Sequence, residues 1–284
     1  MASLRAYLEG QLAGWRDDLV VPWQSFFEGV EPDFAAIGSQ FTYDPNLPMI
    51  PPRRIFPLEG APEGAHVFRA FEGLTPQQVQ VVVIGQDPYP NKARATGRAF
   101  EDGALVDWGG AVAVSLKSIV QSTLAMRLDE PQLNASKAAW SEIRARVRSG
   151  ELQLERIGIW FDRLQAQEGV LFVNAGWTLT RFVSGASDEQ KAHIAMWAPL
   201  MQRLLRGLAE RDRPTVFLLL GNFARDLFAA AGVEAVARAR GTWEAKVQSV
   251  QHPHPNAPGS VAAANPLAKV NQQLEEMGAS GVRW

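Results

Sequence analysis

Four short, almost uninterrupted apolar runs constrain the fold of this chain most strongly. They occupy residues 79–84, 169–173, 215–220 and 246–250, and the first three are dominated by Val, Leu, Ile and Phe. Runs of this kind are typical of strands buried on both faces, because helices cover both sides of a parallel sheet. Helical patterns lie between and around them, at residues 2–19, 189–210 and 266–277. The alternation predicts an α/β domain built on a four-stranded parallel sheet.

The chain length and the prolines indicate how this domain is organised. A chain of 284 residues can form one large domain. Six of the 18 prolines lie within residues 44–64, so this stretch is a rigid approach to the sheet and not a flexible linker. We therefore expect a single domain over residues 1–284, with a helical and Pro-rich approach at 1–65 and a catalytic core at 79–284.

Composition excludes several classes of site. The chain has no cysteine, which rules out thiolate zinc sites, iron–sulfur clusters and cysteine nucleophiles. The formal net charge is −2, so a nucleic-acid partner would need a local basic face. The N-terminal stretch is interrupted by charges, unlike a signal peptide, and no apolar run approaches the roughly 20 residues of a membrane helix. We expect a cytoplasmic protein.

A carboxylate follows the first predicted strand. Residues 85–90 read GQDPYP, so Asp87 stands at the strand end, and Pro88 and Pro90 stiffen the loop behind it. Asp-Pro commonly opens a turn, and this is the ordinary interpretation of such a segment taken alone. A fixed carboxylate beside an apolar wall can also position water as a general base or stabilise a cationic, sugar-like transition state.

The other three strand ends also carry polar or turn residues. Asn174 follows the second strand, Gly221 and Asn222 follow the third, and HPHPN at 252–256 follows the fourth. Asn174 could cap a turn, or its amide could read a carbonyl and an N–H together. Because ligands bind beyond the carboxyl ends of parallel strands, we expect these loops to meet at one edge of the sheet.

The paired histidines have two interpretations. His252 and His254 could bind a metal ion together with Asp87, as in a metal-dependent hydrolase. Prolines follow both histidines and stiffen the loop more than ligation requires, so we expect no metal. A neutral imidazole that donates to developing negative charge is the other interpretation.

Basic residues follow the first loop and recur in a later helical pattern. Lys92, Arg94 and Arg98 would suit phosphates if they face the same edge, although a charge cluster is usually a solvated face. The pattern at 136–149 is typical of an ordinary surface helix. The sequence contains no Walker loop, no GxGxxG after a strand and no GxSxG, so nucleotide-dependent and serine-hydrolase chemistry gain no support.

Taken in order, these loops resemble those of the family 1 uracil-DNA glycosylases. The matching segments are GQDPYP at 85–90, Gly-x-x-Phe at 97–100, VSL at 114–116, LFVNAGWTLTR at 171–181, LLLGNFA at 218–224 and HPHPN at 252–256. The resemblance covers about residues 12–284, with roughly two dozen residues inserted between Ser115 and Gly169, near 125–165. It implies a three-layer α/β/α fold around the four-stranded parallel sheet.

The resemblance also implies a chemistry. Enzymes of this family flip a nucleotide out of DNA and hydrolyse its N-glycosidic bond without metal or cofactor. Asp87 would orient the attacking water and support the cationic sugar, and His252 would stabilise charge on the departing base. The implied base-binding residues are Gln86, Tyr89, Phe100 and Asn174, and the ring of Tyr89 would exclude a 5-methyl group. The implied DNA contacts are Pro90, Ser115, Gly221, Asn222, His254, Pro255 and Asn256.

Several positions depart from the family pattern. Pro90 stands where a histidine is usual, His254 where a serine is usual, and Asn256 where a leucine wedge usually fills the place of the flipped base. Trp177 is expected to add bulk beside Asn174. These departures concern the expected pocket rim and leave Asp87 and His252 in place.

We expect a monomeric DNA glycosylase that excises uracil in base excision repair, because Asn174 and Tyr89 both favour uracil. The alternative is the same chemistry on a modified pyrimidine, such as a hydroxymethylated or glucosylated cytosine of phage DNA. The altered rim and the insertion motivate that alternative. The metal-dependent hydrolase and a DNA-binding protein that has lost catalysis are further alternatives.

Overall fold

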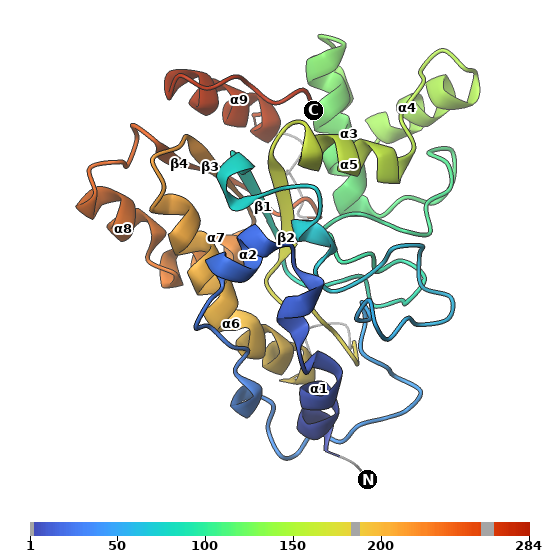
Figure 1. Ribbon diagram of the computed structural model, residues 1–284. Coiled ribbons are helices and arrows are strands. Elements are labelled where there is room, and N and C mark those ends of the chain that lie inside the picture. The colour runs from blue at the N-terminus through green and yellow to red at the C-terminus, as the bar shows by residue number, and fades with distance from the viewer. Residues whose placement is uncertain (1–2, 183–187, 257–263) are drawn as a thin grey trace.

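A four-stranded parallel sheet forms the centre of the computed structural model, which describes residues 3–182, 188–256 and 264–284 (Figure 1). The strands are β1 (Val81–Gly85), β2 (Val170–Asn174), β3 (Thr215–Leu220) and β4 (Val247–His252), in the order β2–β1–β3–β4. All three pairings are parallel. The four predicted strands are thus confirmed, with bounds displaced by two residues at most.

Helices cover both faces of the sheet, as the predicted three-layer fold requires (Figure 1). Val82, Leu171 and Phe217 point into one core and Val81, Phe172 and Leu218 into the other, following the two-residue period of a strand. The first core is covered by α1 (Leu4–Leu12), α2 (Val21–Phe26), α6 (Asp188–Ala209), α7 (Asn222–Ala230) and α8 (Val233–Ala239). The second is covered by α3 (Val114–Arg127), α4 (Ala139–Arg148), α5 (Ile157–Ala166) and α9 (Pro266–Glu276).

The predicted helices are present, and one is shorter than expected. The patterns at 189–210 and 266–277 are α6 and α9, and α4 lies within 136–149. The first pattern extends to residue 19, but α1 ends at Leu12 because Gly14 turns the chain with a φ of 65°. A 3-10 turn over Trp15–Asp18 then continues the buried face. No helix among the described residues is long and apolar enough to cross a membrane.

The Pro-rich approach is tied to the first helix through a buried arginine. Arg53 is 1% exposed, forms an ion pair with Asp18, and donates to the carbonyl oxygens of Ala13 (2.9 Å) and Gly14 (3.2 Å). A buried guanidinium needs such a complete set of acceptors. Arg53 therefore fixes the Pro-rich stretch against the N-terminal helix and the 3-10 turn that follows it.

A buried hydrogen-bond network fixes the first turns of α6 to the loop after β2. The indole of Trp197 donates to the Thr178 hydroxyl (2.8 Å), which lies 2.9 Å from Nδ1 of His193. Nε2 of His193 lies 2.9 Å from the Thr180 hydroxyl, and that hydroxyl donates to Glu189 (2.6 Å). Burial lowers the pKa of His193 to about 3, so this imidazole is neutral in the folded protein.

The neutral state of His193 predicts a pH-dependent contribution to stability. The unfolded chain binds a proton at this side chain near its ordinary pKa of 6.5, whereas the folded chain does not until about pH 3. The contribution is therefore complete above pH 6.5 and is lost as the pH falls toward 3, by up to ~1.4 kcal/mol per pH unit.

Comparison with His193→Gln isolates this contribution, because the other titrating groups are common to both proteins. We expect the wild type to be the more stable at about pH 7, and its advantage in the free energy of unfolding to shrink as the pH is lowered to about 4. Urea titrations across that range measure the difference. A difference that does not change with pH would contradict a buried neutral His193.

Candidate active site

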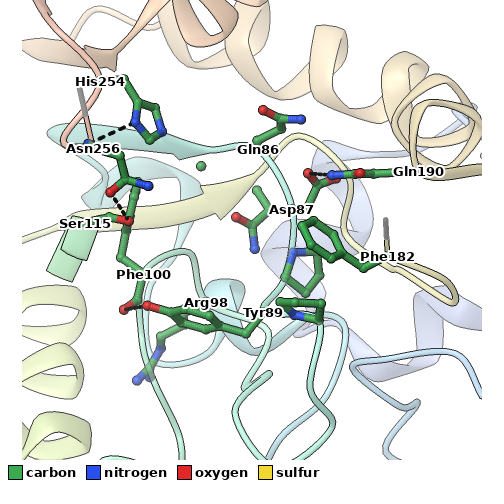
Figure 2. Close-up of a pocket in the computed structure, with 14 residues that line it drawn as sticks. Gln86, Asp87, Tyr89, Arg98, Phe100, Ser115, Phe182, Gln190, His254 and Asn256 are labelled. Carbon is green, nitrogen blue, oxygen red and sulfur yellow. Dashed lines mark hydrogen bonds between the residues drawn. The ribbon is translucent and has the colours of Figure 1, made fainter. Parts of the chain in front are cut away.

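A cavity of about 440 Å³ opens at the carboxyl edge of the sheet (Figure 2). Its walls come from the loop after β1, the end of β2, the start of α3, the start of α6 and the segment 252–256, which we call the His-Pro segment. The lining residues are Gly85, Gln86, Asp87, Pro88, Tyr89, Pro90, Arg98, Phe100, Ser115, Asn174, Phe182, Gln190, His254 and Asn256. Loops from three of the four strand ends therefore meet at one site.

Asp87 is half-buried on one side of this cavity. Its Oδ2 accepts a hydrogen bond from Nε2 of Gln190, in the first turn of α6 (Figure 2). Its Oδ1 is buried and has no hydrogen-bond partner among the described residues. Burial raises the pKa of Asp87 to about 6, and the neighbouring amide side chains of Gln190 and Gln86 act in the opposite direction. The carboxylate thus keeps one oxygen for a proton-bearing reactant and titrates near neutral pH.

Two glycines allow side chains of the site to lie directly against the backbone near Asp87. A Cβ on Gly176 would stand 3.3 Å from Oδ1 of Asp87, and the Gly176 N–H donates to the carbonyl of Gln86 (2.9 Å). Gly85 pairs in register with Asn174, and a Cβ at Gly85 would overlap the side-chain oxygen of that asparagine. The amide of Asn174 can therefore lie across the end of β1 only because Gly85 has no side chain.

The other expected base-binding residues line the same cavity. Phe100 has a φ of 67°, a left-handed conformation that costs free energy in a residue with a side chain. Its carbonyl accepts from the Tyr89 hydroxyl at 3.4 Å, and the guanidinium of Arg94 lies 4.4 Å from the centre of the Tyr89 ring. These two contacts hold the Tyr89 ring in place. Gln86, in contrast, has an exposed side chain.

Two of the basic residues near this loop are paired with carboxylates of the same chain. Arg94 donates to both carboxylate oxygens of Asp102, at 3.1 and 2.6 Å. The side chain of Arg98 is 4% exposed and donates to Asp162 (2.6 Å) and Glu101 (3.4 Å). Internal carboxylates thus pair with both arginines, and their suitability for phosphates stays a prediction. Lys92 remains exposed.

The two histidines of the His-Pro segment occupy different places. His254 lines the main cavity, whereas His252, the last residue of β4, is not among the lining residues. His252 lines a small cavity of about 20 Å³ whose other walls include Leu218, Leu220 and Leu267. Of the two expected catalytic residues, the structure brings only Asp87 to the main cavity.

The expected DNA contacts divide in the same way. Pro90, Ser115 and Asn256 line the cavity with His254, and the Ser115 hydroxyl donates to the Asn256 side chain at 3.4 Å (Figure 2). Pro255 is buried, and its carbonyl accepts from Ser118 (3.2 Å). The remaining two lie outside the lining of the cavity: Gly221 is buried against His254, and Asn222 begins α7 and accepts from Arg225.

Trp177 does not narrow the cavity, contrary to expectation. Its side chain is 3% exposed and stacks on Trp197 with 4.7 Å between ring centres. Its indole N–H donates to the sulfur of Met201 (3.1 Å). The expectation was wrong because the indole fits into the aromatic core beneath α6, which offers it more contacts than the cavity rim.

Sequence reasoning missed two residues of the site, Gln190 and Phe182. Gln190 belongs to the helix that follows β2, and a helix in that position begins at the carboxyl edge of the sheet. That rule could have directed attention to its first turn, although nothing in the sequence distinguishes Gln190 from its polar neighbours. Phe182 is 47% exposed at the cavity rim, and no pattern around it indicated this.

The described residues contain no group of three or more His, Asp or Glu side chains that could hold a metal ion. Asp87 and His254 lie on opposite sides of the cavity (Figure 2). The arrangement proposed for a metal-dependent hydrolase, with Asp87 and both histidines around one ion, is therefore not formed by these residues.

The cavity is lined by a carboxylate of raised pKa, an asparagine amide, aromatic rings, and an imidazole on the side opposite the carboxylate. These are the groups needed to hold a planar heterocycle and to hydrolyse its bond to a sugar. Hydrolysis of such a bond is the chemistry of an N-glycosidase.

Comparisons with known proteins agree with this class. Residues 72–275 match the model of the Uracil DNA glycosylase superfamily. The uracil-DNA glycosylase of Pediococcus pentosaceus is 28% identical over 224 residues, covering 78% of this chain and 79% of the relative. That of Bovine herpesvirus 1.1 is 29% identical over 224 residues, covering 78% and 88%.

Solved structures share the fold. The UNG crystal structure from Nitratifractor salsuginis covers 96% of this chain and 98% of its own, with 20% identity and a TM-score of 0.60. The mimivirus uracil-DNA glycosylase covers 96% and 92%, with 17% identity and a TM-score of 0.56. The chain belongs to the uracil-DNA glycosylase superfamily, and it is a DNA N-glycosylase.

The contact between Gln190 and Asp87 predicts the pH dependence of base release. With a pKa of about 6, the carboxylate protonates as the pH falls through that value, and activity should fall with it. Gln190→Leu removes a hydrogen bond to the charged form, so the acid limb of the rate profile should move upward by roughly 0.5–1 pH unit. Single-turnover base release between about pH 5 and pH 8 measures the shift.

The matched control for this substitution is Gln202→Leu, at an exposed position of the same helix. It should leave the acid limb in place. An unchanged limb in Gln190→Leu would mean that another group controls the acid side of the profile.

Proposed function

We propose that the protein excises uracil from DNA, with Asp87 as the carboxylate that positions water and supports the cationic sugar. The observation that carries the proposal is Oδ1 of Asp87, which is buried at the cavity wall and has no hydrogen-bond partner among the residues that the structure describes. Water bound there can attack the sugar carbon and pass its proton to the carboxylate, while the electron pair of the broken C–N bond leaves with the base. The relatives support the choice of base, since they are uracil-DNA glycosylases.

Base recognition would rest on Asn174, Phe100 and Tyr89. The Asn174 amide offers one acceptor and two donors in a plane, as the edge of uracil requires, and it makes no hydrogen bond to another described side chain. Phe100 supplies a wall for stacking. Tyr89, held by Arg94 and the Phe100 carbonyl, would stand against the 5-position and refuse a methyl group.

An imidazole of the His-Pro segment would stabilise the charge that develops on the departing base. The family resemblance gives this role to His252, whereas His254 is the imidazole that lines the cavity. Ser115, Pro90 and Asn256 lie around the cavity, where the flanking DNA backbone would pass.

We also propose that the protein works as a single domain and as a monomer in the cytoplasm, in base excision repair. Both faces of the sheet are covered by helices of the same chain, and the site is assembled from one chain. DNA is the substrate of the superfamily, which favours an intracellular setting.

A panel of oligonucleotides tests the choice of base. Duplexes carrying uracil, thymine, cytosine or 5-hydroxymethylcytosine are incubated with the protein, and abasic sites are detected by alkaline strand cleavage. We expect release from the uracil duplex alone, because Tyr89, held by Arg94 and the Phe100 carbonyl, would stand against the 5-position of the bound base. Preferential release of the modified cytosine would replace uracil with a modified pyrimidine as substrate. No release from any duplex would contradict the proposed function.

The role of Asp87 predicts the effect of one substitution. Asp87→Asn keeps the shape of the side chain but removes its charge, so base release should fall by roughly 10²–10⁴-fold while binding to uracil-containing DNA persists. Single-turnover kinetics and fluorescence anisotropy measure the two quantities. The control is Asp212→Asn, an exposed carboxylate just before β3 and so at the other edge of the sheet. Near-normal release by Asp87→Asn would remove this residue from the chemistry.

A further inference from the structure

The His-Pro segment offers the sequence His-Pro-x twice, as residues 252–254 and as residues 254–256. We propose that His254, and not His252, supplies the imidazole that donates to the departing base. The proposal rests on the proposed function, because it names the second reacting group of the same site. Three observations support it: where each ring lies, which ring nitrogen carries the proton, and which contacts hold the His-Pro segment.

The positions of the two rings differ. His254 stands in the wall of the main cavity, on the side opposite Asp87 (Figure 2). It can lie there because Gly221 has no side chain: a Cβ at Gly221 would come within 2.8 Å of the Cβ of His254. His252 faces the small cavity among Leu218, Leu220 and Leu267. A base bound between Asp87 and Asn174 would therefore have His254, not His252, on its far side.

The hydrogen bonds of the two rings require opposite tautomers. The backbone N–H of Asn256 donates to Nδ1 of His254 at 3.1 Å, so this nitrogen carries a lone pair and the proton of the neutral ring is on Nε2. His254 thus has an N–H to offer to an oxygen in the cavity. Nδ1 of His252 lies 2.9 Å from the Pro253 carbonyl, which can only accept, so here the proton is on Nδ1.

The remaining nitrogen of His252 is unsuited to the reaction. In the neutral ring, Nε2 of His252 bears a lone pair, which would repel an oxygen that is gaining negative charge. This nitrogen is also buried and has no hydrogen-bond partner among the described residues. His252 therefore has neither the right proton nor access to the main cavity.

The inserted part of the chain anchors the segment in this arrangement. Lys137, in the stretch before α4, donates to the backbone carbonyl of Asn256 at 2.8 Å. Ser118 and Ser115 of α3 hold Pro255 and the Asn256 side chain. Burial, with the positive charge of Lys137 second, lowers the pKa of His254, and the neutral ring is the form that the Asn256 contact requires. Lys137 thus supports both the place and the protonation state of His254.

A pair of serine substitutions separates the two histidines. His254→Ser gives HPSPN, which restores the serine usual in the family at this position and leaves His252 untouched, and His252→Ser is its counterpart. Single-turnover release of uracil is measured for both, with thermal unfolding and binding to uracil-containing DNA as checks on folding. We expect His254→Ser to lose roughly 10²–10³-fold in rate and His252→Ser less than about tenfold.

The outcomes distinguish this proposal from the proposed function. If the wild type releases uracil and His254→Ser is not at least about tenfold slower than His252→Ser, the assignment to His254 is overturned. If the wild type releases no base, the proposed function itself fails. Where either variant unfolds, ¹⁵N NMR of the wild-type imidazoles decides: we expect the proton on Nε2 of His254 and on Nδ1 of His252. The reverse pattern overturns the proposal.

Discussion

The in-register pairing of β1 with β2 is the constraint on which the site depends. It sets Gly85 opposite Asn174, and the absence of a side chain at Gly85 lets the asparagine amide lie over the strand end. The ladder continues past both strands, since Ala175 N–H donates to Gly85 and Gly176 N–H donates to Gln86, each at 2.9 Å. Asp87 is the next residue, so the hydrogen bonds that form the sheet fix the backbone from which its side chain starts.

Burial of the Asp87 carboxylate disfavours its charged form, and this is a cost in free energy that the site carries. A half-buried carboxylate prefers to be protonated, and its pKa of about 6 reflects that preference. Gln190 opposes it, and Gln190 is held in place by the network that runs from Trp197 through His193 to Glu189. A buried core network and a reactive group are thus joined through one turn of α6.

The sequence allowed the sheet and the strand-end residues to be predicted, because a buried strand and the loop beyond it have simple local signatures. Asp87 and Asn174 line one cavity for that reason, and Tyr89 and Phe100, which the family resemblance indicated, line it with them. Side-chain direction could not be predicted in the same way. Trp177 turns into the core because an aromatic cluster receives it, a contact between segments far apart in the chain.

The same limit applies to charges and to repeated motifs. Arg94 and Arg98 are paired by Asp102 and Asp162, and only the folded chain brings Asp162 close to Arg98. In HPHPN, each histidine is followed by a proline, so the local sequence alone does not show which ring faces the cavity. Which histidine lines the cavity depends on two residues outside the HPHPN segment. Gly221 leaves room for His254, and Lys137 binds the Asn256 carbonyl.

The most direct test of this account is a crystal structure of the Asp87→Asn protein bound to a duplex that carries one uracil. The account predicts a uracil flipped into the cavity, with its edge on the Asn174 amide, its face on Phe100, and its sugar carbon next to residue 87. A uracil that remains stacked in the duplex, or that binds outside the cavity formed by these residues, would contradict it.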